Sequence, residues 1–455
     1  MAVPRWAAGA VAEGGPRSDR GRRRAYRVRS QAAAVARGGR ERMASAIDRA
    51  APPRYRFAVE GSLLWLQVAM GLSFIAVAPL FPLIIDDYGI DNATVSLLIG
   101  AGSLAVAIAT LPGSVFAARF GWRRATILGG VLMSSMALAP LADSFAVLLL
   151  LRLAFAVGAA IAIGSLPAAV MSWFPMRELP LVNGLNIVGQ SIGITASVFT
   201  AAFLADLIGW RETLMAFGLT TLAGTVLFAI FARDRERAPG VPAQPPFSVA
   251  ELRVVLRERS TLLLGLGVGG GVATFIAFNA WLPTYYQEEF GFSLERAGAM
   301  AAIPSFFGIV GSLLGSGLSV GLGRRRPLII ASGAVMPFAA LATFVSESPL
   351  LLFPGLALFG MLSWLYFPSA LTMPMELRGM TPERATVAVA TMLSMGNVSG
   401  FFSPLLVGYL RDQTGSFVIG LTICALLPVT LLLAGLLLPE TGPRGRRAAA
   451  TSELA

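Results

Sequence analysis

The stretch Ser114-Val-Phe-Ala-Ala-Arg-Phe-Gly-Trp-Arg-Arg124 is a short basic turn between two long apolar runs, and its layout occurs twice in the chain. The later copy is Ser316-Gly-Leu-Ser-Val-Gly-Leu-Gly-Arg-Arg-Arg326, which places a serine, a glycine and two arginines at the same relative positions. Glycine adopts the positive φ that a tight reversal requires, and arginines hold such a turn on the cytoplasmic side of a membrane. The repeat predicts two homologous membrane halves.

The composition places the chain among multi-pass membrane proteins. Of its 455 residues, 55% are hydrophobic and only 13% are charged, and the mean hydropathy is +0.71. Such values lie outside the range of soluble domains. Because a bilayer core of about 30 Å needs about 20 apolar residues per helix, the apolar runs predict twelve membrane-spanning helices. We place them at 61–85, 94–117, 124–141, 145–171, 182–205, 213–232, 262–284, 295–320, 327–345, 350–373, 385–410 and 417–438.

The arginines predict how the chain is oriented in the membrane. If both termini are cytoplasmic and the spans alternate, every arginine except Arg152, Arg211, Arg296 and Arg411 falls in a cytoplasmic segment. This asymmetry follows the positive-inside rule, so we expect a protein of the cell (cytoplasmic) membrane with both termini in the cytoplasm. The net charge of +11 does not indicate nucleic-acid binding, because the arginines flank the spans and form no single face with interleaved aromatics.

Residue types that the chain lacks exclude several functional classes. No histidine is present, which removes histidine zinc sites and Ser-His-Asp catalysis. The single cysteine, Cys424, provides neither a disulfide framework nor a thiol metal site. We therefore expect no enzyme activity, no metal and no cofactor.

Polar segments divide the chain into five predicted parts. Residues 1–56 form an arginine-rich cytoplasmic tail that we expect to be disordered; the alternative is an over-long start assignment, with the real start at Met43. Residues 57–232 form the first six-helix bundle, 233–260 a cytoplasmic linker, 261–438 the second bundle and 439–455 a cytoplasmic tail. The predicted fold is all-α and integral to the membrane, with twelve transmembrane helices in two pseudo-symmetric six-helix bundles. We expect a monomer.

A second repeat lies within the predicted spans. Gly189-Gln-Ser-Ile-Gly193 in the fifth span matches Gly396-Asn-Val-Ser-Gly400 in the eleventh. Glycines four residues apart permit close approach of helices in lipid, which explains the glycines themselves. The matching polar residues, Gln190 and Asn397, also fit a functional position.

Together these motifs resemble the major facilitator superfamily from Ala58 to Pro443. The basic turns are similar to that family's signature loops after spans two and eight, and Arg152, Gly209-Trp-Arg211 and Pro439-Glu-Thr-Gly442 are also familiar from it. The resemblance implies two bundles that give alternating access to a site near the middle of the membrane. The expected conformational-switch loops are formed by Gly121, Arg123, Arg124, Gly323, Arg325 and Arg326.

The chain departs from the family pattern at Ala118 and Val320, where an aspartate is usual. We therefore expect the arginines of the turns to find other partners, such as helix carboxyl ends or Glu178 and Glu383. The closed state should then depend less on these turns than it does in the family.

Polar side chains within apolar spans are the candidates for substrate contacts. Arg152 is the foremost, because a charge inside a span is costly and usually pairs or faces a cavity. It could bind an anion, or it could brace a neighbouring helix through backbone carbonyls, which we favour. Interhelical hydrogen bonding or interfacial anchoring is the alternative for the other candidates. These are Gln67, Asn186, Gln190, Asn279, Trp364, Tyr366 and Asn397.

The acidic residues predict the mode of energy coupling. Every one maps to a loop or a helix end, Glu60 and Asp412 among those nearest to the spans, and a proton-coupled carrier normally needs a titratable group in its pathway. We therefore expect facilitated diffusion, exchange, or co-transport in which the substrate itself carries the proton.

These observations favour a secondary transporter for a small organic or inorganic anion, whose partners are that substrate and the lipid bilayer. The pattern looks most like carriers related to cyanate and nitroimidazole transporters. An efflux carrier for drug-like compounds is an alternative, although the glycine-proline motif of drug/proton antiporters is missing after Gly193. A membrane receptor or assembly factor that kept the fold without transport is the alternative from another class.

Overall fold

The structure is a computed structural model, and it describes residues 55–174, 178–233, 253–377, 380, 382–442 and 444. The predicted tail at 1–56 lies almost entirely outside these residues, as do most of the linker at 233–260 and of the tail at 439–455. The described part is helical throughout, with no strand. This agrees with the predicted all-α class.

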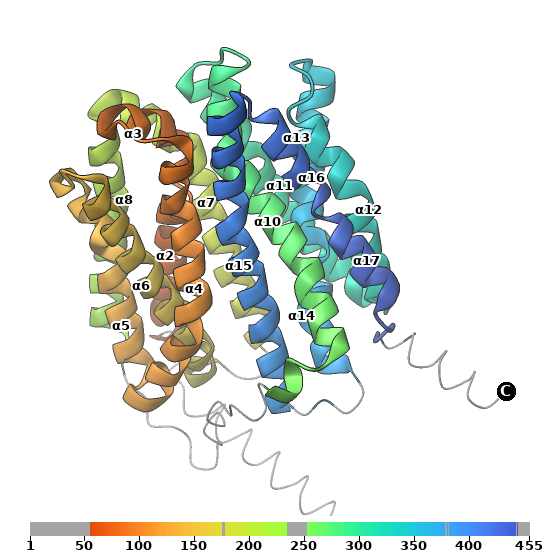
Figure 1. The fold of residues 1–455 in the computed structure, drawn as a ribbon. Helices are drawn as coiled ribbons and strands as arrows, with labels where there is room; N and C mark the ends of the chain where they lie inside the picture. The colour runs from red at the N-terminus through yellow and green to blue at the C-terminus, as the bar shows by residue number, and fades with distance from the viewer. Residues whose placement is uncertain are drawn as a thin grey trace, which may run out of the picture. The chain divides into compact units, whose positions relative to one another are not determined.

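Helices of the first half follow the six predicted spans (Figure 1). The first span is interrupted, and the third ends in a 3-10 helix that contains Pro140. Proline removes a backbone donor and breaks the regular helix there. The elements are α2 (Tyr55–Phe74), η2 (Ala78–Leu80), α3 (Phe81–Tyr88), α4 (Asn92–Phe120), α5 (Trp122–Met133), η3 (Ser134–Leu141), α6 (Phe145–Trp173), α7 (Leu179–Ile208) and α8 (Trp210–Phe231).

The second half repeats this plan and is interrupted in its fourth and sixth spans, beside Pro368 and Pro428. Its elements are α10 (Arg259–Glu288), α11 (Leu294–Leu322), α12 (Arg326–Ala342), α13 (Pro349–Leu365), α14 (Phe367–Glu376), α15 (Pro382–Thr414), α16 (Val418–Leu426) and α17 (Val429–Leu437). Eleven helical stretches are long and apolar enough to cross a membrane, and α12 is a shorter apolar helix of 17 residues. With α12, the described helices make up the predicted twelve.

Glycines at both basic turns adopt the backbone conformation that the sequence predicts. Gly121 has φ of 93° between α4 and α5, and Gly323 has φ of 56° after α11. We call the end of the helices that bears these two turns the arginine end. The other end, which bears the turns at Gly89 and Gly209, is called the opposite end.

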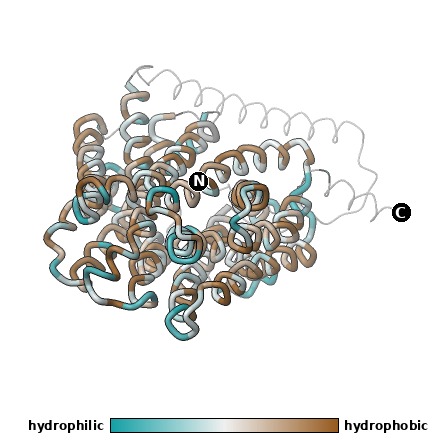
Figure 2. Tube along the Cα trace, turned by 90° about the horizontal axis from the view of Figure 1, so that it is seen from above, coloured by the Kyte–Doolittle hydropathy of each residue, from teal (hydrophilic) through white to brown (hydrophobic). Residues whose placement is uncertain are grey.

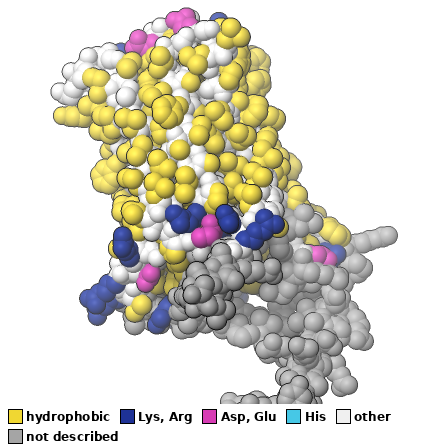
Figure 3. Space-filling model, turned by 90° about the vertical axis from the view of Figure 1, so that its right-hand side faces the viewer, with side chains coloured by type: hydrophobic (Ala, Val, Ile, Leu, Met, Phe, Trp, Pro, Cys, Tyr) yellow, Lys and Arg dark blue, Asp and Glu magenta, His cyan; other side chains and the backbone are white. Residues whose placement is uncertain are grey.

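The outer surface of the helices is suited to lipid. Large apolar side chains such as Ile230 and Phe338 are exposed along the spans. Seen along the helices, hydrophobic residues occur on all sides (Figure 2). From the side, they form a broad belt, with arginines gathered at its lower border (Figure 3). Two spans are more enclosed than the others. Of an apolar 18-residue stretch in each, 67% of the residues are buried in the first span and 78% in α10, against at most 50% in the other long spans.

Close packing of α2 on α7 depends on glycines of the second repeat. A Cβ atom on Gly193 would lie 2.0 Å from the Val68 carbonyl oxygen, and one on Gly71 would lie 2.1 Å from the Gln190 carbonyl oxygen. No side chain fits at such distances, so backbones touch here as the small-residue interpretation predicts.

The two halves meet through α4 against α15 and through α7 against α11. At the opposite end, the Asp412 carboxylate of α15 accepts hydrogen bonds from the Ala93 backbone N–H at 2.8 Å and the Asn92 side-chain amide at 2.7 Å, both on α4. The ring of Phe81 also packs on Trp281 of α10, with 5.2 Å between centroids. These contacts join the halves near the opposite end.

Candidate functional site

Arg152 of α6 is buried, with 3% of its surface exposed, and contacts two other helices of the first half. Its Nε donates to the Leu98 carbonyl oxygen of α4 at 2.8 Å. Its Nη1 donates to the Ser73 carbonyl oxygen at 2.5 Å, and its Nη2 donates to that of Phe74. This is the bracing arrangement that the sequence favours, while contact with substrate stays a prediction.

Two of the carbonyls that Arg152 binds, those of Ser73 and Phe74, are available because α2 ends at Phe74 and the chain resumes as η2 only at Ala78. The last carbonyls of a helix have no intrahelical donor, and in lipid they need another one. Arg152 supplies it. No carboxylate pairs with Arg152 in the part of the chain that the structure describes, so its positive charge stays without a counter-charge.

Glu60 corrects the expectation that every acidic residue lies in a loop or at a helix end. The predicted first span begins at residue 61, but α2 begins at Tyr55 and places Glu60 within the helix. Glu60 is 7% exposed and Asn186 of α7 is fully buried. The Asn186 side-chain nitrogen donates to Glu60 Oε1 at 2.7 Å. A buried carboxylate therefore lies within α2 near the arginine end, while the expected mode of energy coupling stays a prediction. The charge next to the apolar run was the sequence signal for it.

Gln67 of α2 and Gln190 of α7 lie deeper along the same two helices. Gln67 is buried and Gln190 is half-buried. Neither side chain has a recorded hydrogen bond to the described residues, so their amides remain available to a ligand. Gln67 lies seven residues before Phe74, roughly 10 Å from the helix end that Arg152 binds.

The asparagines of the second half are occupied by local hydrogen bonds. Asn279 of α10 donates to the Phe275 carbonyl oxygen at 2.8 Å and accepts from the Ser305 hydroxyl of α11 at 3.1 Å. Asn397 of α15 donates to the Leu393 carbonyl oxygen at 3.0 Å. The Ser305 contact is an interhelical bond of the kind that the alternative interpretation expects, whereas the other two bonds lie within one helix.

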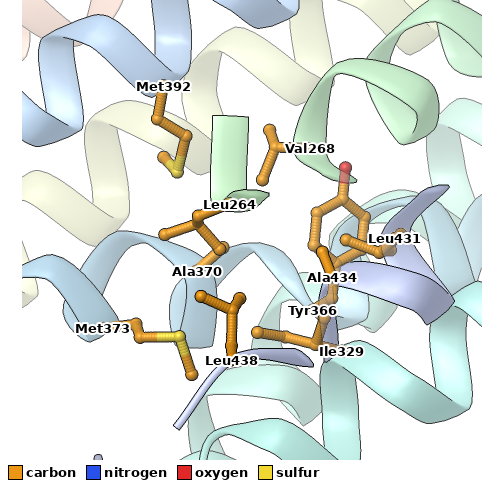
Figure 4. Close-up of a cluster of buried hydrophobic side chains, with 10 residues drawn as sticks. All are labelled: Leu264, Val268, Ile329, Tyr366, Ala370, Met373, Met392, Leu431, Ala434 and Leu438. Carbon is orange, nitrogen blue, oxygen red and sulfur yellow. The ribbon is translucent and has the colours of Figure 1, made fainter. Parts of the chain in front are cut away.

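Tyr366 and Trp364 lie where α13 meets α14. Tyr366 is buried in an apolar cluster (Figure 4). The cluster comprises Leu264, Val268, Ile329, Tyr366, Ala370, Met373, Met392, Leu431, Ala434 and Leu438. The half-buried Trp364 packs edge to face on Phe275 and Phe367, with centroids 5.5 Å and 5.1 Å apart. Tyr366 therefore has a packing role, and Trp364 is the more accessible of the two.

Arginines of both basic turns contact helix carboxyl ends, and one of them also pairs with a glutamate. Arg123 donates to the Ala229 carbonyl oxygen near the end of α8 at 3.0 Å, and Arg326 donates to that of Gly435 near the end of α17 at 2.8 Å, so helix carboxyl ends take part as expected. Arg325 binds both carboxylate oxygens of Glu376, at 2.8 and 3.1 Å. Glu178 instead pairs with Arg56 at 3.1 Å.

The expected contact of the turns with Glu383 stays a prediction. The Glu383 side chain lies outside the described residues. Glu440 accepts from the backbone N–H groups of Arg325 and Arg326. The second turn is therefore fastened by two carboxylates, Glu376 and Glu440, that the sequence reasoning missed.

The described residues contain no group of three His, Cys, Asp or Glu side chains that could hold a metal ion. Cys424 is buried, with its thiol 3.8 Å from the Ser403 carbonyl oxygen.

A family model and solved structures match this chain. The family model described as "Major Facilitator Superfamily" matches residues 63–381. A bacterial homologue of the human lysosomal transporter Spinster, solved in an inward-facing and unoccupied conformation, superimposes with a TM-score of 0.71 over 84% of this chain and 95% of its own, at 16% identity. That likeness concerns the fold alone.

Curated relatives are more distant than 30% identity but cover most of the chain. A protein of Cupriavidus necator named "Probable sulfoacetate transporter SauU" is 26% identical over 74% of this chain and 83% of its own length. The "Probable L-galactonate transporter" of Escherichia coli is 26% identical over 79% and 84%. The "Quinolone resistance transporter" of Acinetobacter baumannii is 24% identical over 77% and 85%.

Proposed function

Because the chain belongs to the major facilitator superfamily, we propose that it is a secondary transporter for a small anion that works by alternating access between its two halves. The substrate is a small organic or inorganic anion, and the membrane is the cell membrane, with the arginine end in the cytoplasm. No enzymatic role, cofactor or nucleic-acid partner is proposed, and the working unit is the monomer.

The uncompensated charge of Arg152 is the observation that carries this proposal. A positive charge within the membrane is costly, and its hydrogen bonds to carbonyls spread that charge without cancelling it. An anion between the halves would lower that cost. At about 8 Å and an effective dielectric constant of about 20, the attraction is about 2 kcal/mol, or roughly 30-fold in Kd.

The proposed contacts are buried or half-buried polar side chains of the spans that have no hydrogen-bond partner among the described residues. Gln67 and Gln190 offer free amide groups, and Trp364 offers an indole N–H. Asn279 and Asn397 retain part of their hydrogen-bonding capacity, whereas Tyr366 packs in an apolar cluster. Arg152 contributes through its charge and through the shape that it imposes on the end of α2.

Relatives support an anionic substrate. Two of the three curated relatives are named for transport of sulfoacetate or L-galactonate, which are both carboxylates. The relative named for quinolone resistance favours the second candidate, an efflux carrier for drug-like compounds. The narrower resemblance to cyanate and nitroimidazole carriers stays a prediction.

The contacts between the halves indicate which side is closed. The Asp412 contact with α4 and the Phe81 contact with Trp281 join the halves at the opposite end. We infer that the described conformation admits substrate from the arginine end. Transport then requires these contacts to separate.

The test is a binding and transport experiment on the purified full chain. Thermal unfolding is followed with sulfoacetate, with a six-carbon sugar acid and with a hydrophobic cationic drug, and uptake of labelled anion is measured in proteoliposomes. Arg152→Lys keeps the charge and Arg152→Ala removes it. Arg411→Gln removes a half-buried arginine that pairs with Glu288 at the opposite end and is the matched control.

An anion that stabilises the native chain, Arg152→Lys and Arg411→Gln but not Arg152→Ala supports the proposal. Stabilisation only by the cationic drug favours the efflux candidate. Anion binding without uptake favours a receptor with this fold. Anion stabilisation that survives in Arg152→Ala removes Arg152 from the site.

A further inference from the structure

We propose that Glu60 and Asn186 form a proton-binding site, in which a neutral Glu60 donates its Oε2–H to Asn186 Oδ1 and thereby joins α2 to α7 near the arginine end. The site lies outside the proposed anion contacts. It involves only a proton taken from water by the Glu60 carboxylate and returned to water when the pair opens, so no bond other than O–H forms or breaks.

The orientation of the Asn186 side chain is fixed by its neighbours. Its nitrogen donates to Glu60 Oε1 at 2.7 Å and to the Val182 carbonyl oxygen at 3.0 Å. A backbone carbonyl only accepts, so the atom that faces Val182 must be the nitrogen. Both N–H groups of the amide are then used, and the amide oxygen is the only remaining polar atom of the side chain.

Two buried acceptors are left over on the same two side chains. Glu60 Oε2 and Asn186 Oδ1 are both buried and have no hydrogen-bond partner among the described residues. If Glu60 were ionised, a charged oxygen and an amide oxygen would both remain unsatisfied in an apolar region, which is unfavourable. One proton on Oε2 provides the missing donor and satisfies both atoms.

Among the residues that the structure describes, no cation pairs with Glu60 in the observed arrangement. Arg56 lies one helical turn from Glu60 on α2, but its guanidinium pairs with Glu178 at the start of α7. On α8, which packs on α2 through Trp65, the charged residue at this end is Arg233, and Arg123 of α5 binds the Ala229 carbonyl oxygen. The guanidinium groups of Arg56 and Arg123 thus have partners other than Glu60.

Ionisation offers Glu60 a different partner. The Nε atom of Arg56 is buried and unpaired, and positions i and i+4 of a helix share a face. A carboxylate at Glu60 would therefore turn from Asn186 on α7 toward Arg56 on its own helix. The pair thus has two arrangements, and only the protonated one connects α2 with α7.

The second half has no such pair. Relative to the glycines of the second repeat, the position that corresponds to Asn186 is Leu393, which packs against the apolar cluster of that half and has no polar side chain, and the one that corresponds to Glu60 is Gly267. The first half alone therefore responds to protons here. Since α7 also packs against α11 of the other half, loosening α7 from α2 alters the movement between halves, a consequence that rests on the proposed transport function.

Two measurements on the full chain test the site. Infrared difference spectra at neutral pH compare the native chain with Glu60→Gln, which keeps both hydrogen bonds with an amide, and with the control Glu288→Gln. Asn186→Leu copies the residue of the second half and leaves Glu60 without its acceptor. Uptake of anion is measured in proteoliposomes across a pH series, with equal pH on both sides.

We expect a carboxylic acid C=O band in the native chain that is lost in Glu60→Gln, retained in Glu288→Gln and shifted to higher frequency in Asn186→Leu. The pH dependence of uptake should be lost in Glu60→Gln. A carboxylate band of Glu60 in place of the acid band, or identical pH profiles for the native chain and Glu60→Gln, overturns the inference. If the native chain moves no anion, the proposed function fails while the infrared result still decides the state of Glu60.

Discussion

Replacing Asp412 by alanine removes a polar contact between the halves at the opposite end. The Asp412 carboxylate accepts from the backbone N–H groups of Asn92 and Ala93, at 3.2 and 2.8 Å, and from the Asn92 side chain at 2.7 Å. These groups form the amino end of α4, where the helix dipole also favours a negative charge. The substitution should therefore favour opening at this end.

The expected size of the effect follows from these three bonds. Hydrogen bonds to a charged group contribute about 1.5 to 3 kcal/mol when buried. The atoms here are exposed, and exposed charge pairs contribute only about 0.2 to 1 kcal/mol. Three bonds at the exposed value give about 0.6 to 3 kcal/mol. That free energy changes the ratio of open to closed molecules roughly 3- to 150-fold.

A cysteine at Ser96 reports on opening. Ser96 is fully buried between the halves, and its hydroxyl contacts the Pro404 carbonyl oxygen of α15 at 3.1 Å. A thiol reagent reaches this position only when α4 and α15 separate. The native Cys424 is buried, so the unsubstituted chain provides the background rate. We expect Asp412→Ala to raise the rate at which Ser96→Cys is modified by the factor given above.

The control for this experiment is Glu288→Gln. Glu288 pairs with Arg411 at 2.8 Å at the same end, but both residues belong to the second half, so breaking that pair removes no bond between the halves. With Glu288→Gln added, Ser96→Cys should be modified at the same rate as Ser96→Cys alone. An unchanged rate in Asp412→Ala, or an equal increase in Glu288→Gln, would refute the reasoning.

Three other predictions concern the turns, the glycines and a helix cap. Arg325→Ala should cost about 2 kcal/mol of stability, because a half-buried bidentate ion pair is lost. Arg123→Ala should cost below about 1 kcal/mol and impair transport only modestly, because one carbonyl bond is lost. Thermal unfolding and uptake of both variants measure the difference. Gly193→Leu should abolish folded protein in size-exclusion profiles, since a Cβ there would lie 2.0 Å from the Val68 carbonyl oxygen, and folded Gly193→Leu would contradict the close packing. The pKa of Asp91 is lowered because Thr94 donates hydrogen bonds to its carboxylate. The stabilisation that these bonds provide exists above the unfolded-state pKa of about 3.9 and is lost as the pH falls through the lower folded-state value. The difference in unfolding temperature between the native chain and Asp91→Asn should therefore narrow on acidification.

The close similarity between predicted and observed spans has a simple physical origin. Hydrophobic length and turn glycines act locally, because a helix in lipid must satisfy its backbone internally and must reverse where the apolar run ends. The first span shows the limit of this reasoning. Its apolar run starts after Glu60, yet α2 begins at Tyr55, because packing on α7 and the bond to Asn186 extend the helix beyond the apolar run.

The sequence by itself determined the twelve helices, the two halves and the glycine turns at Gly121 and Gly323, since these depend on hydrophobicity and local backbone geometry. The tertiary structure decided which polar side chains meet. Arg152 contacts the interrupted end of α2, and Glu60 faces Asn186 across more than one hundred residues of chain. Such contacts depend on the rotation of each helix about its axis and on its register against helices far away in sequence, and neither quantity is encoded in the apolar pattern of one span.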